Sequence, residues 1–353
     1  MISQGLLFAA AGVLVMALFL GSGSDSLAWD FRFSYLPAAE SVVSGDSPYP
    51  DSAIGAVAGR SGYIYPPQLA FALAPFTLVS PDVAAVLAVV GALGALLGAL
   101  WIVGVRDPMC FAALLLWAPA WNALELANVS ALLALGLALA WRYRATTWPL
   151  AAVLGLAVAT KLFLWPLLVW AAATQRLRQA ALAVGLGAAV TLVSWAALGF
   201  EGLTGYPDLL RVYSEFQAET SYSIVAVASL FGAGDSIGRL LMLIVGALLL
   251  LGCIRAGRRA EELRAFSYAI AGALALSPIV WQHYLVLLAV PLAISRPRFS
   301  MLWLLPIILW VSPRAGNGAG VETILPAVVA SVLLVSVVAR SGWRAAPQRP
   351  VPA

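Results

Sequence analysis

The amino-acid sequence predicts an all-α membrane protein whose helices cross a bilayer several times. The first observation is composition: 62% of the 353 residues are hydrophobic and 10% are charged, whereas a soluble domain carries roughly 25% charged residues. The second is that apolar stretches recur from one end of the chain to the other. Too few polar side chains remain to cover a globule in water. Soluble enzymes, nucleic-acid-binding proteins and disordered scaffolds are therefore excluded.

Helices are predicted at the apolar runs of the chain. These runs cover residues 5–21, 83–104, 109–121, 128–141, 147–160, 163–174, 179–199, 236–254, 265–280, 284–295, 299–312 and 323–339. Several are shorter than the roughly 20 residues that span a bilayer. We expect these to be short or broken helices facing a protein-lined cavity, because interrupted backbone is tolerated at membrane depth only there. A further run, 66–79, is either a full span or a half-inserted helix.

The basic residues favour the half-inserted alternative. With the amino terminus inside and 66–79 turning back, 14 of the 20 Lys and Arg residues are cytoplasmic: Arg106, Arg142, Arg144, Arg176, Arg178, Arg255, Arg258, Arg259, Arg264, Arg296, Arg298, Arg340, Arg344 and Arg349. This distribution satisfies the positive-inside rule, whereas a full span at 66–79 reverses it. About twelve spans with both termini inside are therefore predicted. Only Asp107, Glu261 and Glu262 are then inside, which leaves 13 of the 16 acids outside.

The chain is expected to form one transmembrane domain over residues 1–353. Two long loops, 22–82 and 200–235, lie on the acidic outer face, where we expect any chemistry. The Pro- and Arg-rich tail, 340–353, is predicted to be a disordered cytoplasmic segment. The two cysteines lie in apolar stretches, which indicates buried hydrophobes rather than a disulfide or a metal site.

The first outer loop is predicted to begin with an amphipathic helix in the membrane interface. Tyr35, Ala39 and Val42 fall on one helical face, with Leu36 and Val43 beside it. The Gly- and Pro-rich segment that follows is expected to end this helix.

Asp30 is the candidate catalytic base of this loop. It lies about nine residues beyond the first apolar run, and a carboxylate there can accept a proton from a hydroxyl if burial holds its pKa near the working pH. The alternatives are a helix N-cap or an ion-pair partner for Arg32.

Lys161 and His283 are the sole lysine and the sole histidine of the chain. A lysine between two short apolar runs is a functional candidate, because a charge at membrane depth is costly unless it is paired or hydrated. It suits a phosphate as a point charge, and the alternative is a lysine that extends to the interface. His283 follows Trp281 and Gln282 at the outer end of a span, and its alternative is a hydrogen-bonded interface residue. One histidine without further His or Cys ligands does not make a metal site.

Several of these segments resemble the GT-C glycosyltransferases, and most closely glycosyltransferase family 87, the polyprenyl-phosphate-mannose-dependent mannosyltransferases. The resemblance rests on Asp30 with Tyr35 five residues on, Ala38-Ala39, Gly45, Pro48-Tyr49, Tyr65-Pro66-Pro67, the Lys161-aromatic-Pro166 stretch and the Ser277-Pro278 turn before Trp281 and His283. Where the family commonly carries Gly-Gln-x-Asn, this chain has Ala127-Asn128-Val129-Ser130, after Asn122 and Glu125.

The resemblance implies a GT-C type helix bundle in which Asp30 is the base. Lys161 and His283 would hold the donor phosphate or sugar with help from Gln282 and Trp281. Tyr35, Tyr65 and Arg32 of the first loop complete the expected substrate-binding set.

The expected activity is transfer of a hexose, mannose first, from a polyprenyl-phosphate donor to a glycolipid or glycan acceptor with inversion at the anomeric carbon. The expected partners are these substrates and membrane lipids, with no nucleic acid, no cofactor and no metal. The expected location is a bacterial plasma membrane, with the site facing the periplasm or exterior. The alternative is a transporter or lipid flippase, and a weaker one is an inactive scaffold of a cell-envelope complex.

Overall fold

The protein is all-helical in its computed structural model. The structure describes residues 4–20, 27–49, 62–217, 220–312 and 321–340, and this part of the chain contains no β-strand. The predicted all-α class is confirmed. The predicted disorder of the tail concerns residues that, from 341 onward, lie outside the described part.

The first half of the chain contains α1 (Gln4–Leu20), the π-helical turn η2 (Phe31–Tyr35), α2 (Leu36–Ser44), α4 (Pro67–Leu73), the 3-10 helix η3 (Ala74–Leu78), α5 (Pro81–Ile102), α6 (Pro108–Leu115), α7 (Ala118–Glu125) and α8 (Ser130–Arg142). The second half contains α9 (Thr147–Thr160), η4 (Leu162–Leu164), α10 (Pro166–Ala173), α11 (Leu177–Ala197), α12 (Tyr206–Gln217), α13 (Ile224–Leu230), α14 (Asp235–Arg258), α15 (Glu262–Ala275), η5 (Gln282–Leu288), α16 (Ala289–Ser295), η6 (Met301–Val311) and α17 (Val321–Arg340). These helices follow the predicted apolar runs closely.

Three described helices, α5, α11 and α14, are long and apolar enough to cross a membrane. Helices α7 and α8 together would form a fourth span, but they are bent by 118° at the break between them. Most other apolar runs form shorter helices, several of which begin with proline because proline is favoured in the first helical turn and interrupts a longer helix. The count of twelve spans stays a prediction.

The first outer loop carries the expected helix as η2 followed by α2. Tyr35, Ala39 and Val42 are buried, whereas Val43, beside this stripe, is 59% exposed. Its position follows from the 100° step between Val42 and the next residue, which turns the side chain away from the packed face. Gly45 ends α2 with φ +85°, a conformation that costs glycine little.

Helices α9 and α11 pack most closely, through glycine. A Cβ on Gly155 would lie 2.7 Å from the carbonyl oxygen of Ala183, and one on Gly187 would lie 3.0 Å from the oxygen of Gly155. This contact holds the end of α9, and Lys161 after it, against α11. Gln68 of α4 adds a polar link, because its amide donates to Ala159 O at 2.6 Å.

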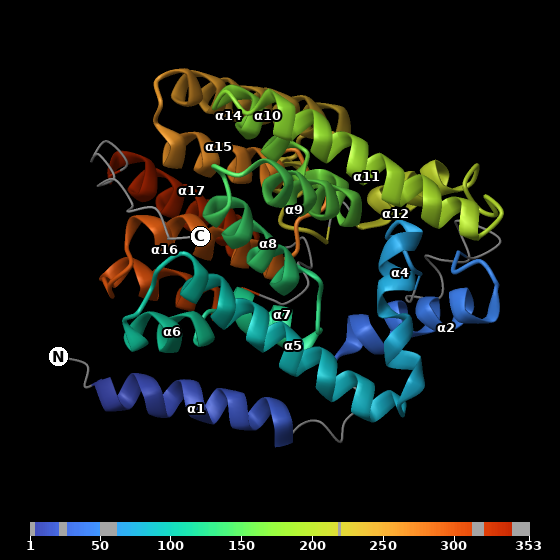
Figure 1. Cartoon of the computed structure of the whole chain (residues 1–353). Helices are drawn as coiled ribbons and strands as arrows, with labels where there is room; N and C mark the ends of the chain where they lie inside the picture. The colour runs from blue at the N-terminus through green and yellow to red at the C-terminus, as the bar shows by residue number, and fades with distance from the viewer. Residues whose placement is uncertain (1–3, 21–26, 50–61, 218–219, 313–320, 341–353) are drawn as a thin grey trace.

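The outer-loop helices α2, α4 and α12 gather at one end of the molecule, on the right in Figure 1. At the start of α15, Glu262 accepts hydrogen bonds from Arg144 and Arg176, which adjoin α8 and α11. The three residues were predicted to lie together on the inner face, and the structure brings them into contact.

Candidate active site

Side chains from five separate segments meet in a polar cluster beside α2 and α4. The polar cluster, as the term is used below, comprises Asp30, Tyr35, Tyr65, Asn128, Lys161 and Tyr284. They come from the start of η2, the segment before α4, the α7–α8 bend, the break after α9, and η5. Of the residues predicted from the sequence, Asp30, Tyr35, Tyr65 and Lys161 are brought together here.

Asp30 is held by an amide rather than by a cation. Asn128 Nδ2 donates to Asp30 Oδ2 at 2.5 Å. The Asp30 side chain makes no N-cap hydrogen bond, and Arg32 instead pairs with Asp82 at 2.8 Å. The structure therefore shows neither of the structural roles that were the alternatives for Asp30.

Burial raises the pKa of Asp30 above the usual carboxylate range. The hydrogen bond from Asn128 and the charge of Lys161 act in the opposite direction and favour the carboxylate. A carboxyl group with a raised pKa is a better proton acceptor than an exposed one, as general base catalysis requires.

A hydrogen-bond chain connects the Asp30 side of the cluster to the Lys161 side. Asn128 Nδ2 also donates to the Tyr35 hydroxyl at 3.0 Å, and Tyr35 donates to the Tyr65 hydroxyl at 2.9 Å. The Tyr35 and Tyr65 rings meet edge to face, with centroids 5.2 Å apart. Both phenols are buried. The hydrogen bonds between them therefore make the structure between Asp30 and Lys161 more rigid.

Lys161 is a buried cation among aromatic rings. It is extended between α9 and η4, as expected for a helix break, and only 7% of the residue is exposed. Its Nζ lies 3.8 Å from the Tyr284 ring centroid, 5.2 Å from Tyr65 and 5.9 Å from Phe163. No described residue accepts a hydrogen bond from this ammonium. The lysine does not extend to the interface, so that alternative was wrong.

His283 lies next to the aromatic rings around Lys161 and is also buried. Its Nδ1 is 3.0 Å from Asn122 Oδ1, and its ring meets that of Tyr284 with centroids 4.9 Å apart. With the amide oxygen of Asn122 assigned to the side facing the ring, Nδ1 carries the ring hydrogen. In the neutral ring, Nε2 is then an acceptor, and it has no hydrogen-bond partner among the described residues.

The second outer loop lies near the cluster through α12. Tyr213 is partly buried, and burial together with the nearby Asp30 carboxylate raises the pKa of its phenol to about 12. Tyr206, also of α12, donates to the backbone oxygen of Ile64, next to Tyr65, at 3.0 Å. Helix α12 therefore joins the two outer loops beside the candidate site.

The remaining predicted residues have other contacts. The Gln282 amide donates to Leu309 O at 2.8 Å and is buried. Trp281 is partly buried at the start of η5. Arg32 also donates to Leu27 O at 3.0 Å. The described contacts do not bring these three side chains into the polar cluster.

Sequence reasoning assigned no role to Asn122, Asn128 and Tyr284, which touch the key groups. For the two asparagines, the available signal was the same one that identified Lys161, namely polar residues at a break between apolar runs. Asn128-Val129-Ser130 also matches the N-glycosylation sequence pattern, but Asn128 is 3% exposed and its amide is engaged in the cluster.

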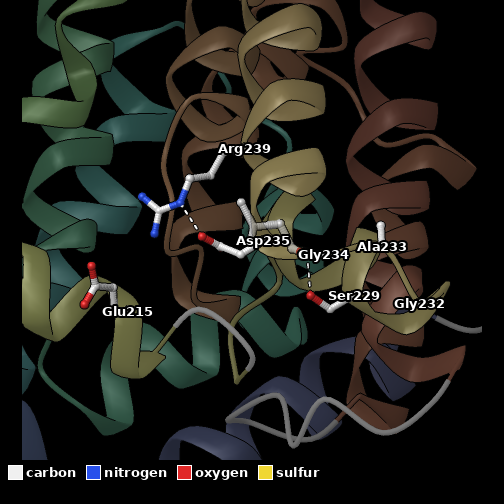
Figure 2. Close-up of a pocket in the computed structure, with 8 residues that line it drawn as sticks. Glu215, Ser229, Gly232, Ala233, Gly234, Asp235 and Arg239 are labelled. Carbon is white, nitrogen blue, oxygen red and sulfur yellow. Dashed lines mark hydrogen bonds and ion pairs between the residues drawn. The ribbon is translucent and has the colours of Figure 1, made fainter.

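A separate depression of about 440 Å³ lies between α12, α13 and the start of α14. Figure 2 shows its polar lining, in which Arg239 pairs with Asp235 at 2.7 Å. Glu215 is exposed and pairs with Arg211. The depression contains none of the residues predicted from the sequence. Among the described residues, no three His, Cys, Asp or Glu side chains lie close enough to hold a metal ion.

The fold is that of a helical membrane protein. Its polar cluster combines a partly buried carboxylate, Asp30, with a lysine, Lys161, that is surrounded by aromatic rings. The sequence matches glycosyltransferase family 87 over residues 63–291, more than half of the chain. The chain belongs to that family, which is part of the GT-C superfamily, and it is a glycosyltransferase of the membrane. The matched range includes Tyr65, Lys161 and His283 and begins after Asp30. No curated protein and no solved structure matches the chain.

Proposed function

We propose that this glycosyltransferase moves a hexose, mannose first, from a polyprenyl-phosphate donor to a glycolipid or glycan acceptor. The observation that carries the proposal is Lys161, a buried ammonium with aromatic rings around it and no hydrogen-bond acceptor among the described residues. A buried charge of this kind is costly without a partner. The phosphate of a lipid-linked sugar supplies the missing negative charge and oxygen acceptors.

Asp30 is the general base of the proposed reaction. Its carboxylate takes the proton of the acceptor hydroxyl, and the acceptor oxygen bonds to the anomeric carbon as the bond from that carbon to the phosphate oxygen breaks. One displacement of this kind inverts the anomeric configuration. Lys161 neutralises the charge that develops on the leaving polyprenyl phosphate.

His283 is assigned to the sugar rather than to the phosphate. With its Nδ1 hydrogen directed at Asn122, the neutral ring offers Nε2 as an acceptor. An acceptor nitrogen suits a sugar hydroxyl and repels phosphate oxygens. The reaction needs no metal in this scheme, because Lys161 performs the electrostatic role that a divalent cation performs in other transferases.

The apolar helices and the predicted charge distribution support an outer-face site in a bacterial plasma membrane. The positive-inside rule puts Arg144 and Arg176 on the inner side. Helices α2 and α4 lie at the right-hand end of the molecule in Figure 1, away from α15, whose first residue, Glu262, pairs with these arginines.

The test is transfer of labelled mannose from polyprenyl-phosphate-mannose to a panel of alkyl glycosides by the purified protein. We expect Asp30→Asn to reduce transfer at least a hundredfold with little change in donor affinity, because a general base contributes typically 10²–10⁴-fold. Asp82→Asn is the matched control, since Asp82 is 84% exposed and pairs with Arg32. Activity of Asp30→Asn within a few-fold of wild type would exclude Asp30 as the base. Uptake of the donor into vesicles without product would instead favour a transporter.

A further inference from the structure

The α7–α8 bend contains an amide with a fixed orientation. Ser130 N–H donates to Asn128 Oδ1 at 2.9 Å, and the Ser130 hydroxyl donates to the same oxygen at 2.7 Å. A backbone N–H is always a donor, so it fixes which end of the amide is oxygen. The Nδ2 end of Asn128 must then point at Asp30 and Tyr35.

The bend is built to hold this amide in place. Ala127 takes a left-handed conformation, with φ +46°, and the chain turns there by 118° between α7 and α8. Asn128 N–H donates to Ala123 O at 2.9 Å, and the residue is 3% exposed. Strained backbone of this kind is retained where the surrounding structure requires it.

Both hydrogens of the Asn128 amide are used within the cluster, one on Asp30 and one on Tyr35. Because the amide cannot turn round, Nδ2 needs an acceptor, so the Asp30 oxygen that it contacts, Oδ2, carries no proton. An N–H donor binds a carboxylate oxygen more strongly than the carbonyl oxygen of a neutral acid, so this hydrogen bond favours the ionised form of Asp30. No described residue is seen to donate to the other carboxylate oxygen, Oδ1. That oxygen is the one available to an acceptor hydroxyl.

We propose that Asn128 is a positioning residue for the transfer reaction: it holds Asp30 as a carboxylate, with Oδ2 occupied and Oδ1 presented to the acceptor. The proposal rests on the proposed role of Asp30 as the base. It adds a residue that does not touch the substrate and acts through Asp30.

Other groups around Asp30 do not replace this amide. The charged group that faces Asp30 is Lys161, and the titratable phenols that interact with it are those of Tyr35, Tyr65, Tyr213 and Tyr284. Lys161 favours the carboxylate as well, but it makes no hydrogen bond to it. Asn128 is therefore the group that fixes the position of the carboxyl group by a hydrogen bond, and together with Lys161 it favours the ionised state.

The first measurement is the pH profile of kcat/KM for Asn128→Leu and Asn128→Asp. Loss of a hydrogen bond to the charged form raises the pKa of a carboxyl group, and a second carboxylate raises it further. We expect the acid limb to move up by about one pH unit for Leu and more for Asp. The fall should be in kcat rather than in the KM for donor, with partial recovery at higher pH.

The matched control is Asn122→Leu, the same change at the other asparagine of this region. Its partner is His283 rather than Asp30, so we expect lower activity with an unmoved acid limb. A merely structural role of Asn128 would lower kcat/KM equally at all pH values, and that result would overturn the proposal.

A second measurement needs no substrate. An infrared pH titration of the purified protein follows the protonated carboxyl band, and Asp30→Asn identifies the contribution of Asp30. A midpoint shifted upward in Asn128→Leu supports the positioning role even if no sugar transfer is found, in which case only the proposed function fails. An unshifted midpoint in an active enzyme overturns the positioning role and leaves the proposed function intact.

Discussion

Replacing Lys161 by Met should make the protein more stable and at the same time remove donor binding. Methionine has a similar length and no charge, and it packs well against aromatic rings. Lys161 is 7% exposed and has no hydrogen-bond acceptor among the described residues. The substitution therefore removes a buried charge without breaking a described hydrogen bond.

The magnitude follows from two opposing contributions. A lysine at membrane depth costs about 3 kcal/mol, and desolvated cation–π contacts offset about 2 kcal/mol. The three rings around Nζ lie at 3.8, 5.2 and 5.9 Å. We expect Lys161→Met to raise the free energy of unfolding of the ligand-free protein by on the order of 1 kcal/mol.

Donor binding should change in the opposite direction. A hydrogen bond to a charged group contributes roughly 1.5–3 kcal/mol, which corresponds to about a 10- to 150-fold weaker Kd. Thermal unfolding with and without polyprenyl phosphate measures both effects in one assay. Arg211→Met is the control, because Arg211 is exposed and pairs with acids of its own helix.

The outcome that refutes this reasoning is a Lys161→Met protein that is less stable than wild type and still stabilised by polyprenyl phosphate. Lys161 would then be a structural cation with an undescribed partner. Unchanged stability with lost binding would retain the phosphate role but refute the estimated cost of burial.

Further predictions concern pH, the inner ion pairs and helix packing. Burial raises the pKa of Asp30, and the base works only as a carboxylate. Transfer should therefore be lost on acidification at a pH above the usual carboxylate range. A pH–rate profile that stays flat down to pH 4 contradicts this prediction. Glu262→Gln removes the negative charge that pairs with two partly buried arginines and replaces one of its two acceptor oxygens by a donor. We expect a loss of about 1–2 kcal/mol in thermal unfolding, against less than about 0.5 kcal/mol for the exposed Glu215→Gln. Gly155→Ala places a Cβ 2.7 Å from a carbonyl oxygen of α11 and should lower the free energy of unfolding by about 1–3 kcal/mol. The control is Gly91→Ala, because a Cβ at that position meets nothing within 4 Å. Equal stabilities of the two variants would argue against the close α9–α11 contact.

Some parts of the site could be predicted because they are local. Lys161 stands out as the only lysine, at a break between two apolar runs, and the structure has that break. The face of α2 formed by Tyr35, Ala39 and Val42 follows from helical periodicity and is buried. Val43, beside this stripe, is 59% exposed, because adjacency to a stripe does not determine how wide the packed face is.

The partners of these residues could not be predicted in the same way. Asn128 and Asp30 are 98 positions apart in the chain, and His283 and Asn122 are 161 apart. No local pattern records which break in one helix faces which break in another. Tyr284 directly follows His283 in the sequence, and no local pattern predicts that its ring lies 3.8 Å from Lys161 Nζ.

The sequence by itself determined the class of protein and the scarcity of charge, because composition and apolar periodicity decide how a chain divides between lipid and water. It also pointed to Lys161 and His283 as the sole residues of their types, and to Asp30 through its position in the first loop and the family resemblance. Only the tertiary structure decided that Asn128 holds Asp30 and that aromatic rings enclose Lys161. The physical reason is that a hydrogen bond and a cation–π contact depend on distance and direction in space, which packing between distant helices sets and spacing along the chain does not.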